Sequence, residues 1–489
     1  MAARGRSIRG GLSKHMKTKL FKRHIESTDC RLPGFPIQKT VFAVTGSALV
    51  TAALAVAPQT LRADEPSPEL ITLDERSSTN SLEGLFEAQG SPLQPKKGAR
   101  TVGEEKAGEE KAVEWFTGES PWWKWSHVTG NWGGLRDALE NGAATIAGSY
   151  TLDWGGPLSG GLSKRGTARG LLDVNLTVDA AKLGLPGGTF FAQYYFRHGR
   201  NGSDDVGELQ AYSNIDEARL SREYELWYEQ KTLNDKLRLK LGQVDANAEF
   251  AFIEAAGEFI HSSAGFCPSI VNFPTYPDPA LSANLFLYPL ENLYIGGGVY
   301  GDGITETSRH GFRQPFYIGE VGVTLPLGET LGPLRLAAGA FYDTGHQDRF
   351  DGGAQGKVNG FYALAEQQIW RENPDDKEDK QGLSVFAHYG YTDAKVSAVE
   401  HHLGLGVSAV GLIPARDADV TGLYWTLAKT SRASDSGFDA DESAFEFFYK
   451  FEVTPAISLK PDLQYITHPG GVKTADDALV FTLRLDVTL

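Results

Sequence analysis

Charged, amide and aromatic side chains recur at even spacings in three stretches of the chain, an arrangement that could bind a polar solute. Alternate residues of an extended strand lie on one face of a sheet, so the members of each stretch can act together. Charged groups and amides hydrogen-bond hydroxyls, and an aromatic ring covers an apolar face. The candidate solute-binding residues are Gln193, Arg197, Glu225, Trp227, Glu229, Arg238 and Lys240. For each of them the alternative stays open that the side chain only keeps a wide polar surface hydrated.

No motif of a known catalytic centre is present. The sequence contains no Gly-x-Ser-x-Gly elbow, no His-Glu-x-x-His pair and no phosphate-binding loop. His401 and His402 are adjacent and therefore point to opposite faces of a strand, which argues against a metal site. Two carboxylates for glycoside hydrolysis stay open, because any two of the many acidic residues could be brought together. We expect a protein that is not an enzyme and has neither metal nor cofactor.

Period-two alternation of apolar and polar residues continues from about residue 143 to the end of the sequence. In the last segment Leu483 and Leu485 share one face while Arg484 and Asp486 share the other. Most such segments have about 8–12 residues, which suits a tilted membrane-spanning strand. Sixteen candidate strands start near residues 143, 169, 189, 222, 237, 281, 293, 316, 333, 360, 382, 401, 421, 444, 457 and 478. The predicted fold class is all-β, a transmembrane antiparallel β-barrel of about 16 strands over residues 143–489.

The predicted connections favour a barrel in a membrane. Short connections such as 232–236 and 289–292 alternate with long ones such as 198–221 and 301–315. This pattern is typical of outer-membrane barrels, which have short periplasmic turns and long outer loops. The polar faces carry charges of both signs, as a water-filled interior requires. A secreted soluble β-rich sugar-binding protein or glycoside hydrolase is the less favoured alternative, because its two-faced strands would need two packed sheets.

The connection 245–280 is too long for a simple turn and is rich in aromatic residues and proline. A long connection within a compact domain usually has a function of its own. We hypothesise that it folds into the barrel and narrows the channel, with its aromatic rings packed against the wall. The predicted constriction residues are Phe259, Phe266, Phe273 and Tyr276.

Residues 1–63 have the organisation of a secretory signal peptide. Residues 1–40 contain ten Lys and Arg against two acidic residues, and an apolar run follows at 41–57. A small residue then precedes Asp64, so we expect cleavage after Ala63. A retained membrane anchor is the weaker alternative, because the run is marginal for the ~20 residues of a spanning helix. Cleavage would leave Cys267 without a second cysteine, so we expect a small buried thiol and no intramolecular disulfide.

Residues 64–114 are predicted to be a low-complexity periplasmic tether. They are rich in Pro, Ser, Glu and Lys, and so little apolar surface cannot offset the entropy of ordering the chain. A solvated spacer is favoured, while attachment to the cell wall stays open. Residues 115–142 are predicted to form a periplasmic lead-in with a short helix that ends at Gly142. The net charge of −15 argues against a nucleic-acid partner.

Several short stretches, taken in order, resemble the carbohydrate-selective porin family (OprB type). Thr129-Gly-Asn-Trp-Gly-Gly-Leu-Arg136 is similar to a stretch that the family carries before its first strand. Similar family motifs follow at Tyr362-Ala-Leu-Ala-Glu-Gln-Gln368, at Gly411-Leu-Ile-Pro-Ala-Arg-Asp-Ala-Asp419 and at Lys460-Pro-Asp-Leu-Gln-Tyr-Ile466. Together these motifs span about residues 122–489.

The resemblance implies a channel in the outer membrane of a diderm bacterium that passes glucose and similar small neutral sugars by diffusion. Its other expected partners are outer-membrane lipid and the barrel-assembly machinery. A general, weakly selective porin is the alternative function.

The resemblance also identifies particular residues. It makes Glu366 a pore-lining residue. The family often has Asp at this position, so the substrate preference is expected to differ from that of members with Asp. For Arg416 and Asp419 a structural ion pair is favoured. Outer-membrane barrels commonly end in an aromatic residue, whereas this sequence ends in Leu489. The structural motif residues are Trp132, Arg136, Arg416, Asp419 and Gln464.

Overall fold

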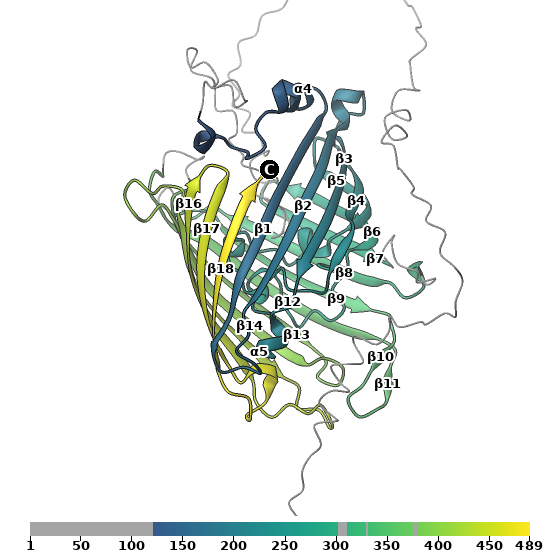
Figure 1. The fold of residues 1–489 in the computed structure, drawn as a ribbon. Helices are drawn as coiled ribbons and strands as arrows, with labels where there is room; N and C mark the ends of the chain where they lie inside the picture. The colour runs from purple at the N-terminus through teal and green to yellow at the C-terminus, as the bar shows by residue number, and fades with distance from the viewer. Residues whose placement is uncertain (1–120, 302–310, 329–330, 375–379) are drawn as a thin grey trace, which may run out of the picture. The chain divides into compact units, whose positions relative to one another are not determined.

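Sixteen strands among the described residues form one closed antiparallel barrel in the computed structural model. β1 (Ala144–Ser159) closes the barrel by pairing with β18 (Ala478–Thr488), and Figure 1 shows these two strands side by side. Closure gives the backbone hydrogen-bonding groups of every strand a partner strand on both sides, as a barrel within the bilayer requires. The structure describes residues 121–301, 311–328, 331–374 and 380–489. The other barrel strands are β2 (Thr167–Asp179), β3 (Gly188–Gly199), β4 (Leu220–Thr232), β5 (Leu237–Val244), β6 (Ala280–Leu290), β7 (Leu293–Tyr300), β8 (Phe316–Leu325), β9 (Leu334–Asp343), β12 (Val358–Arg371), β13 (Gly382–Thr392), β14 (Val399–Val410), β15 (Val420–Thr430), β16 (Glu442–Thr454) and β17 (Ile457–Thr467).

The remaining elements of the described residues are short and lie in the segment before β1 and in the connections. The connection between β9 and β12 carries a two-stranded ribbon of β10 (Gln347–Asp348) and β11 (Ala354–Gln355). In the described ranges no helix has the length and apolar character needed to cross a membrane. The helices are η2 (Trp122–Lys124), η3 (Trp132–Gly134), α4 (Leu135–Asn141), η4 (Ala180–Leu183), α5 (Ser203–Val206), η5 (Ala246–Ala248), η6 (Glu254–Ala256), α6 (Ser262–Gly265), η7 (Gly311–Arg313) and η8 (Pro469–Gly471).

The predicted fold class is confirmed, and every barrel strand starts within two residues of the predicted position. The short helix before the barrel also lies where the sequence predicts it, over Leu135–Asn141. The predicted signal peptide and the predicted tether lie outside the described residues. Local alternation sufficed to locate the strands because each residue's side of the sheet follows from its position along the strand.

The two faces of the barrel differ as alternation predicts. On β16, Phe445 and Phe447 point outward with 54% and 49% of their surface exposed, while Glu446 and Phe448 are buried inside. On β2, Val174 is exposed at the outside and Asp173 is buried inside. The outer face is therefore apolar, and the charged side chains are gathered in the lumen.

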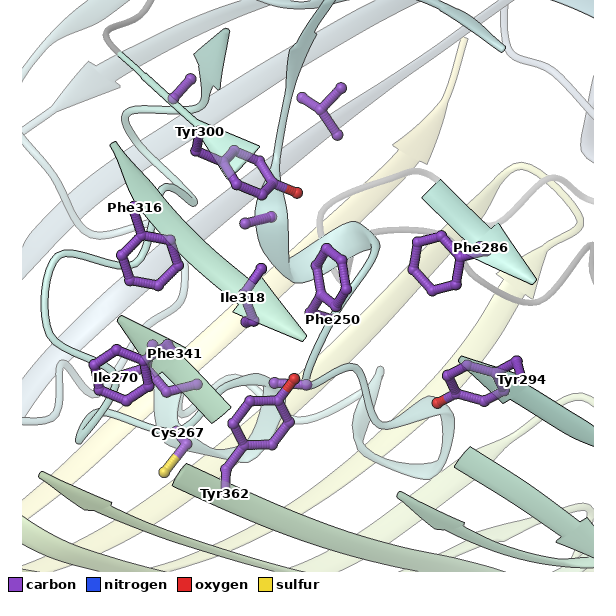
Figure 2. Packing of buried hydrophobic residues seen from close by; sticks show 14 of the residues in the cluster. Phe250, Cys267, Ile270, Phe286, Tyr294, Tyr300, Phe316, Ile318, Phe341 and Tyr362 are labelled. Carbon is purple, nitrogen blue, oxygen red and sulfur yellow. The ribbon is translucent and has the colours of Figure 1, made fainter. Parts of the chain in front are cut away.

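The lumen is partly filled by the connection after β5. Phe250 from this connection stacks on Phe286 of β6 at 5.2 Å between ring centroids, and Cys267 and Ile270 belong to the same buried cluster. Figure 2 shows these side chains beside Tyr362 and other rings contributed by the barrel wall. A hydrophobic core thus lies inside a barrel whose outer face is also apolar.

Candidate functional site: a lumen narrowed by two inward segments

Residues 245–279, here called the inner segment, turn into the barrel at Asp245. The Asp245 side chain accepts a hydrogen bond from the Asn247 N–H at 2.8 Å and so caps η5. The main-chain N–H of Asp245 donates to Glu225 Oε1 on β4 at 2.9 Å. A carboxylate that accepts a main-chain N–H compensates for the loss of water on burial. Glu225 therefore holds the beginning of the inner segment against the wall.

The first attachment of the inner segment is an ion-pair cluster around Glu249. This carboxylate lies 2.7 Å from Arg238 Nη2 and 2.5 Å from Lys240 Nζ, both on β5. Glu229 on β4 pairs with the same two cations, at 3.1 Å and 3.4 Å. Two carboxylates between two cations form a network, which orders side chains better than an isolated exposed pair does.

Aromatic rings support the two cations of this cluster. The Arg238 guanidinium lies 4.2 Å from the centroid of Phe286, and Lys240 Nζ lies 3.9 Å from that of Trp227. Trp227 in turn stacks on Phe191 at 4.8 Å. Cations over ring faces are attracted by the ring quadrupole. The cluster thus combines donors, acceptors and an indole ring that is only half-buried.

The middle of the inner segment crosses β8, β9 and β12 through main-chain contacts. The Ala251 N–H donates to Glu320 Oε2 at 2.8 Å, and the Ala255 N–H donates to Glu366 Oε2 at 3.0 Å. Arg335 donates to the Phe252 carbonyl at 2.9 Å and to Glu366 Oε1 at 2.6 Å. Glu366 is half-buried and has one oxygen on the inner segment and the other on the wall. These side chains satisfy a main chain that has no strand partner there.

The second attachment lies at Glu258. Its carboxylate lies 3.1 Å from Lys450 on β16 and 2.9 Å from Lys460 on β17. The next residue, Phe259, is 2% exposed and makes an edge-to-face contact with Phe448 at 4.9 Å. Glu446 then accepts from the Ile260 N–H at 2.6 Å. The inner segment therefore follows the inner wall from β5 as far as β17.

The part of the inner segment that follows contains buried polar residues and a buried cysteine. Cys267 Sγ lies 3.4 Å from His402 Nδ1 on β14, and His402 Nε2 lies 2.8 Å from Thr426 Oγ1 on β15. Burial raises the pKa of the Cys267 thiol to about 11. Burial also lowers the pKa of His261 to about 3, and His261 Nδ1 accepts from the Ser263 N–H at 3.3 Å. Both side chains are therefore neutral when the inner segment is docked.

A second inward segment, residues 208–216, was missed by the sequence analysis. Gln210 Nε2 donates to Glu442 on β16 at 3.2 Å, and Arg484 on β18 donates to Asn214 Oδ1 at 2.8 Å. The Asn214 N–H donates to the Ile260 carbonyl at 2.8 Å, which joins the two inward segments. The sequence held only a weak signal, namely apolar Tyr212 and Ile215 within an otherwise polar long connection. Both are buried, with 0% and 1% of their surface exposed.

Several predicted solute-binding residues are engaged by other side chains of the wall or by the inward segments. Gln193 donates to Asp173 at 3.0 Å, and Arg197 donates to the Ile215 carbonyl at 3.2 Å. Together with Glu225 these side chains are at most 3% exposed. Glu229, Arg238 and Lys240 retain 7–9% exposure, and Trp227 and Glu366 are half-buried. All of these side chains lie on the inner face of the barrel, but neither alternation nor family resemblance reports what covers them.

The predicted constriction residues differ in their surroundings. Phe259 is enclosed by the wall, whereas Phe266 is half-buried. Phe273 packs against Phe316 with 6.2 Å between ring centroids. Tyr276 lies beside the stacked rings of Tyr195 and Tyr224, and its hydroxyl donates to the Ile215 carbonyl at 3.3 Å. Three of the four therefore contact the barrel wall or the second inward segment.

The motif residues occupy structural positions. Arg416 forms a two-point ion pair with Asp419 at 2.8 Å and 2.7 Å, and the Tyr449 hydroxyl donates to Asp419 at 2.6 Å. Gln464 donates to the Tyr212 carbonyl at 2.8 Å and so supports the second inward segment. Trp132 and Arg136 lie before β1, with 4.2 Å between the guanidinium carbon and the indole centroid.

A closed barrel with an apolar outer face and a charged, narrowed lumen defines the class of the protein as an outer-membrane porin. The chain belongs to the carbohydrate-selective porin, OprB family, whose model matches residues 164–489. Porin B of Pseudomonas aeruginosa is 25% identical over 435 residues, which cover 76% of this chain and 92% of that protein. The high-pH structure of Pseudomonas putida OprB has a TM-score of 0.67 at 20% identity, covering 75% of this chain and 99% of that one. The low-pH structure has a TM-score of 0.52 at 18% identity. The protein is thus a carbohydrate porin of the outer membrane of Gram-negative bacteria.

Proposed function

We propose that small sugars of about the size of glucose diffuse passively through the space left by the inner segment. The observation that carries this proposal is the two-ended attachment of that segment, through Glu249 to β5 and through Glu258 to β16 and β17. A segment held by ion pairs on well-separated strands occupies the lumen at a defined place. It therefore limits the cross-section available to a solute by sterics, with no need for a moving gate.

The first attachment is the proposed place of sugar contact. Arg238 and Lys240 offer N–H donors, Glu229 offers acceptor oxygens, and the half-buried Trp227, whose ring contacts Phe191 and Lys240, offers the remaining apolar part of its indole. Sugar hydroxyls exchange hydrogen bonds with such groups, while the C–H groups of a sugar ring pack on apolar aromatic surface. Glu366, half-buried between Arg335 and the inner segment, is the proposed second contact.

A deletion tests the constriction. Removing residues 264–274 from the inner segment should raise single-channel conductance and admit larger oligosaccharides in liposome swelling. Shortening the β10–β11 ribbon by residues 350–353 is the matched control, because that ribbon belongs to a different connection. An unchanged conductance in a folded deletion variant would place the constriction elsewhere.

Sugar block of ion current tests the contacts. Trp227→Ala and Arg238→Ala should weaken block by glucose, the latter by about 1.5–3 kcal/mol if one charge-assisted hydrogen bond is lost. Arg416→Ala, whose partner Asp419 lies in the β14–β15 connection, should leave block unaltered. Weaker block at an unchanged open conductance indicates lost sugar contact. Weaker block with a raised conductance indicates that the inner segment has been released.

The same measurement addresses a weakly selective porin, the alternative function. A panel of neutral sugars, amino acids and small organic anions should compete unequally if the lumen recognises carbohydrate. Equal permeation of solutes of equal size would support general diffusion instead.

A further inference from the structure

Arg136 on α4 is a buried cation outside the barrel, and the transport function leaves it unexplained. Only 5% of its surface is exposed. Its Nη1 donates to the Ile146 carbonyl on β1 at 3.2 Å, and its Nη2 donates to the main-chain oxygen of Leu489 at 3.0 Å. One guanidinium therefore contacts the first strand and the residue that follows the last strand.

The same side chain also organises the segment that carries it. Nε donates to the Gly130 carbonyl at 3.3 Å, and Nη2 donates to Thr129 Oγ1 at 3.2 Å. The guanidinium packs on Trp132. Gly134, with φ of 87°, provides the left-handed turn that leads into α4, a conformation strained for other residues. The motif is thus folded around its arginine.

A main-chain contact makes the same connection independently. The Val128 N–H donates to the carbonyl of Thr488, the last residue of β18, at 2.9 Å. Leu135 on α4 is 54% exposed, so this residue does not bury an apolar surface against the barrel. Polar contacts to the ends of β1 and β18 therefore contribute to docking of the lead-in. Figure 1 shows α4 beside β1 and the carboxyl end of the chain.

The place of these contacts has a physical consequence. The β1–β18 pair is the closure of the barrel and joins residues that are more than three hundred positions apart, whereas its neighbouring pairs β1–β2 and β17–β18 are hairpins. Closing so long a loop costs more entropy than forming a hairpin. We propose that residues 128–136 form a latch that binds the end of β18 and holds the β1–β18 seam closed at the end where β1 begins.

Hydrogen exchange of the folded full-length porin in detergent tests the latch. Arg136→Gln should accelerate amide exchange in the paired ends 149–154 and 483–488 by about tenfold or more, as expected for the loss of one charge-assisted hydrogen bond. Exchange in β8 and β9, which lie elsewhere in the barrel, should stay unchanged. Glu140→Gln, an exposed charge on the same helix, is the matched control and should change neither region.

Two further variants keep the proposal testable if Arg136→Gln fails to fold. Arg136→Lys retains the charge, but an ammonium group cannot donate to both strands as the planar guanidinium does. It should therefore accelerate amide exchange less than Arg136→Gln does, and only at the β1–β18 seam. Val128→Pro removes the N–H that donates to Thr488 and should act at the same place. Unchanged exchange at the seam, or equal acceleration in β8 and β9, would overturn the latch. Neither result bears on sugar permeation, which is measured separately.

Discussion

Glu258 Oε2 lies 2.9 Å from Lys460 Nζ, which joins two residues 202 positions apart in the sequence. The contact connects the inner segment, which begins after β5, with β17. Lys460 is 3% exposed, so the ammonium would be left buried without its carboxylate. This pair therefore decides where the inner segment stays within the lumen.

Glu258→Gln should loosen the inner segment while leaving the barrel folded. Loss of a buried ion-pair partner costs about 3–5 kcal/mol, and the partial exposure of Lys450 places the expected effect near the lower end. Planar-bilayer recording should show a higher and noisier open current. Asp441→Asn, in an exposed pair with Arg432, is the control and should have little effect. Identical current traces in the two variants would contradict the role of Glu258.

Cys267 should report release of the inner segment. Its thiol is buried, and a pKa of about 11 leaves about a hundredfold less thiolate at neutral pH than an ordinary cysteine has. In a Cys30→Ser background, maleimide labelling of the native porin should therefore be slow, and Glu258→Gln should accelerate it. Urea-unfolded protein supplies the reference rate. Rapid labelling of the native porin would show that the inner segment is not docked as described.

Acid should weaken docking of the inner segment through His261. The pKa of this histidine is lowered to about 3 by burial, so the docked state excludes a proton that the released state binds below its ordinary pKa of about 6.5. The contribution of neutral His261 to the free energy of docking is therefore fully present above about pH 6.5 and is lost as the pH falls toward 3. At pH 5 the loss amounts to about 2 kcal/mol.

His261→Gln tests this pH dependence. The His261 ring lies near Tyr424 and Ser263, and its main-chain N–H donates to Glu446. These three residues are kept in both proteins, so that only the imidazole differs. Labelling of Cys267, normalised at each pH to the rate of the urea-unfolded protein, should accelerate between pH 7 and pH 5 in the unsubstituted porin and less so in the variant. The normalisation is needed because acid lowers the thiolate fraction and so slows labelling of any cysteine. Equal acceleration in both would assign the acid response to another group.

Adjacent residues on β2 test the facing of the barrel. Val174 is 39% exposed on the outer surface, whereas Asn175 points into the lumen and is half-buried. Val174→Arg should destabilise the barrel by up to about 2–4 kcal/mol, depending on its depth in the bilayer. Asn175→Arg, which stays in the polar interior near Asp173, should fold in good yield. The two variants are compared by folding them into lipid vesicles and measuring the folded fraction from the gel mobility of unheated samples.

Local sequence patterns determined the number of strands, their positions and their facing. Along β16 each residue from Ala444 to Phe448 lies on the side that alternation assigns to it. The length and aromatic content of 245–280 also pointed to an inward segment. These features depend on neighbours along one strand or one connection, so they can be inferred without knowing the fold.

Only the tertiary structure decided which lumen side chains remain accessible and which ones hold the inward segments. Glu225 and Trp227 share a strand and a facing, yet Glu225 is buried under Asp245 while Trp227 is only half-buried. The contact of Asn214 with Arg484 and that of Arg136 with Leu489 were likewise not predictable. Such pairs bring together residues 270 and 353 positions apart, and only closure of the barrel makes them neighbours. Period-two alternation carries no information about contacts across a lumen, because it records the side of a strand and not what lies opposite.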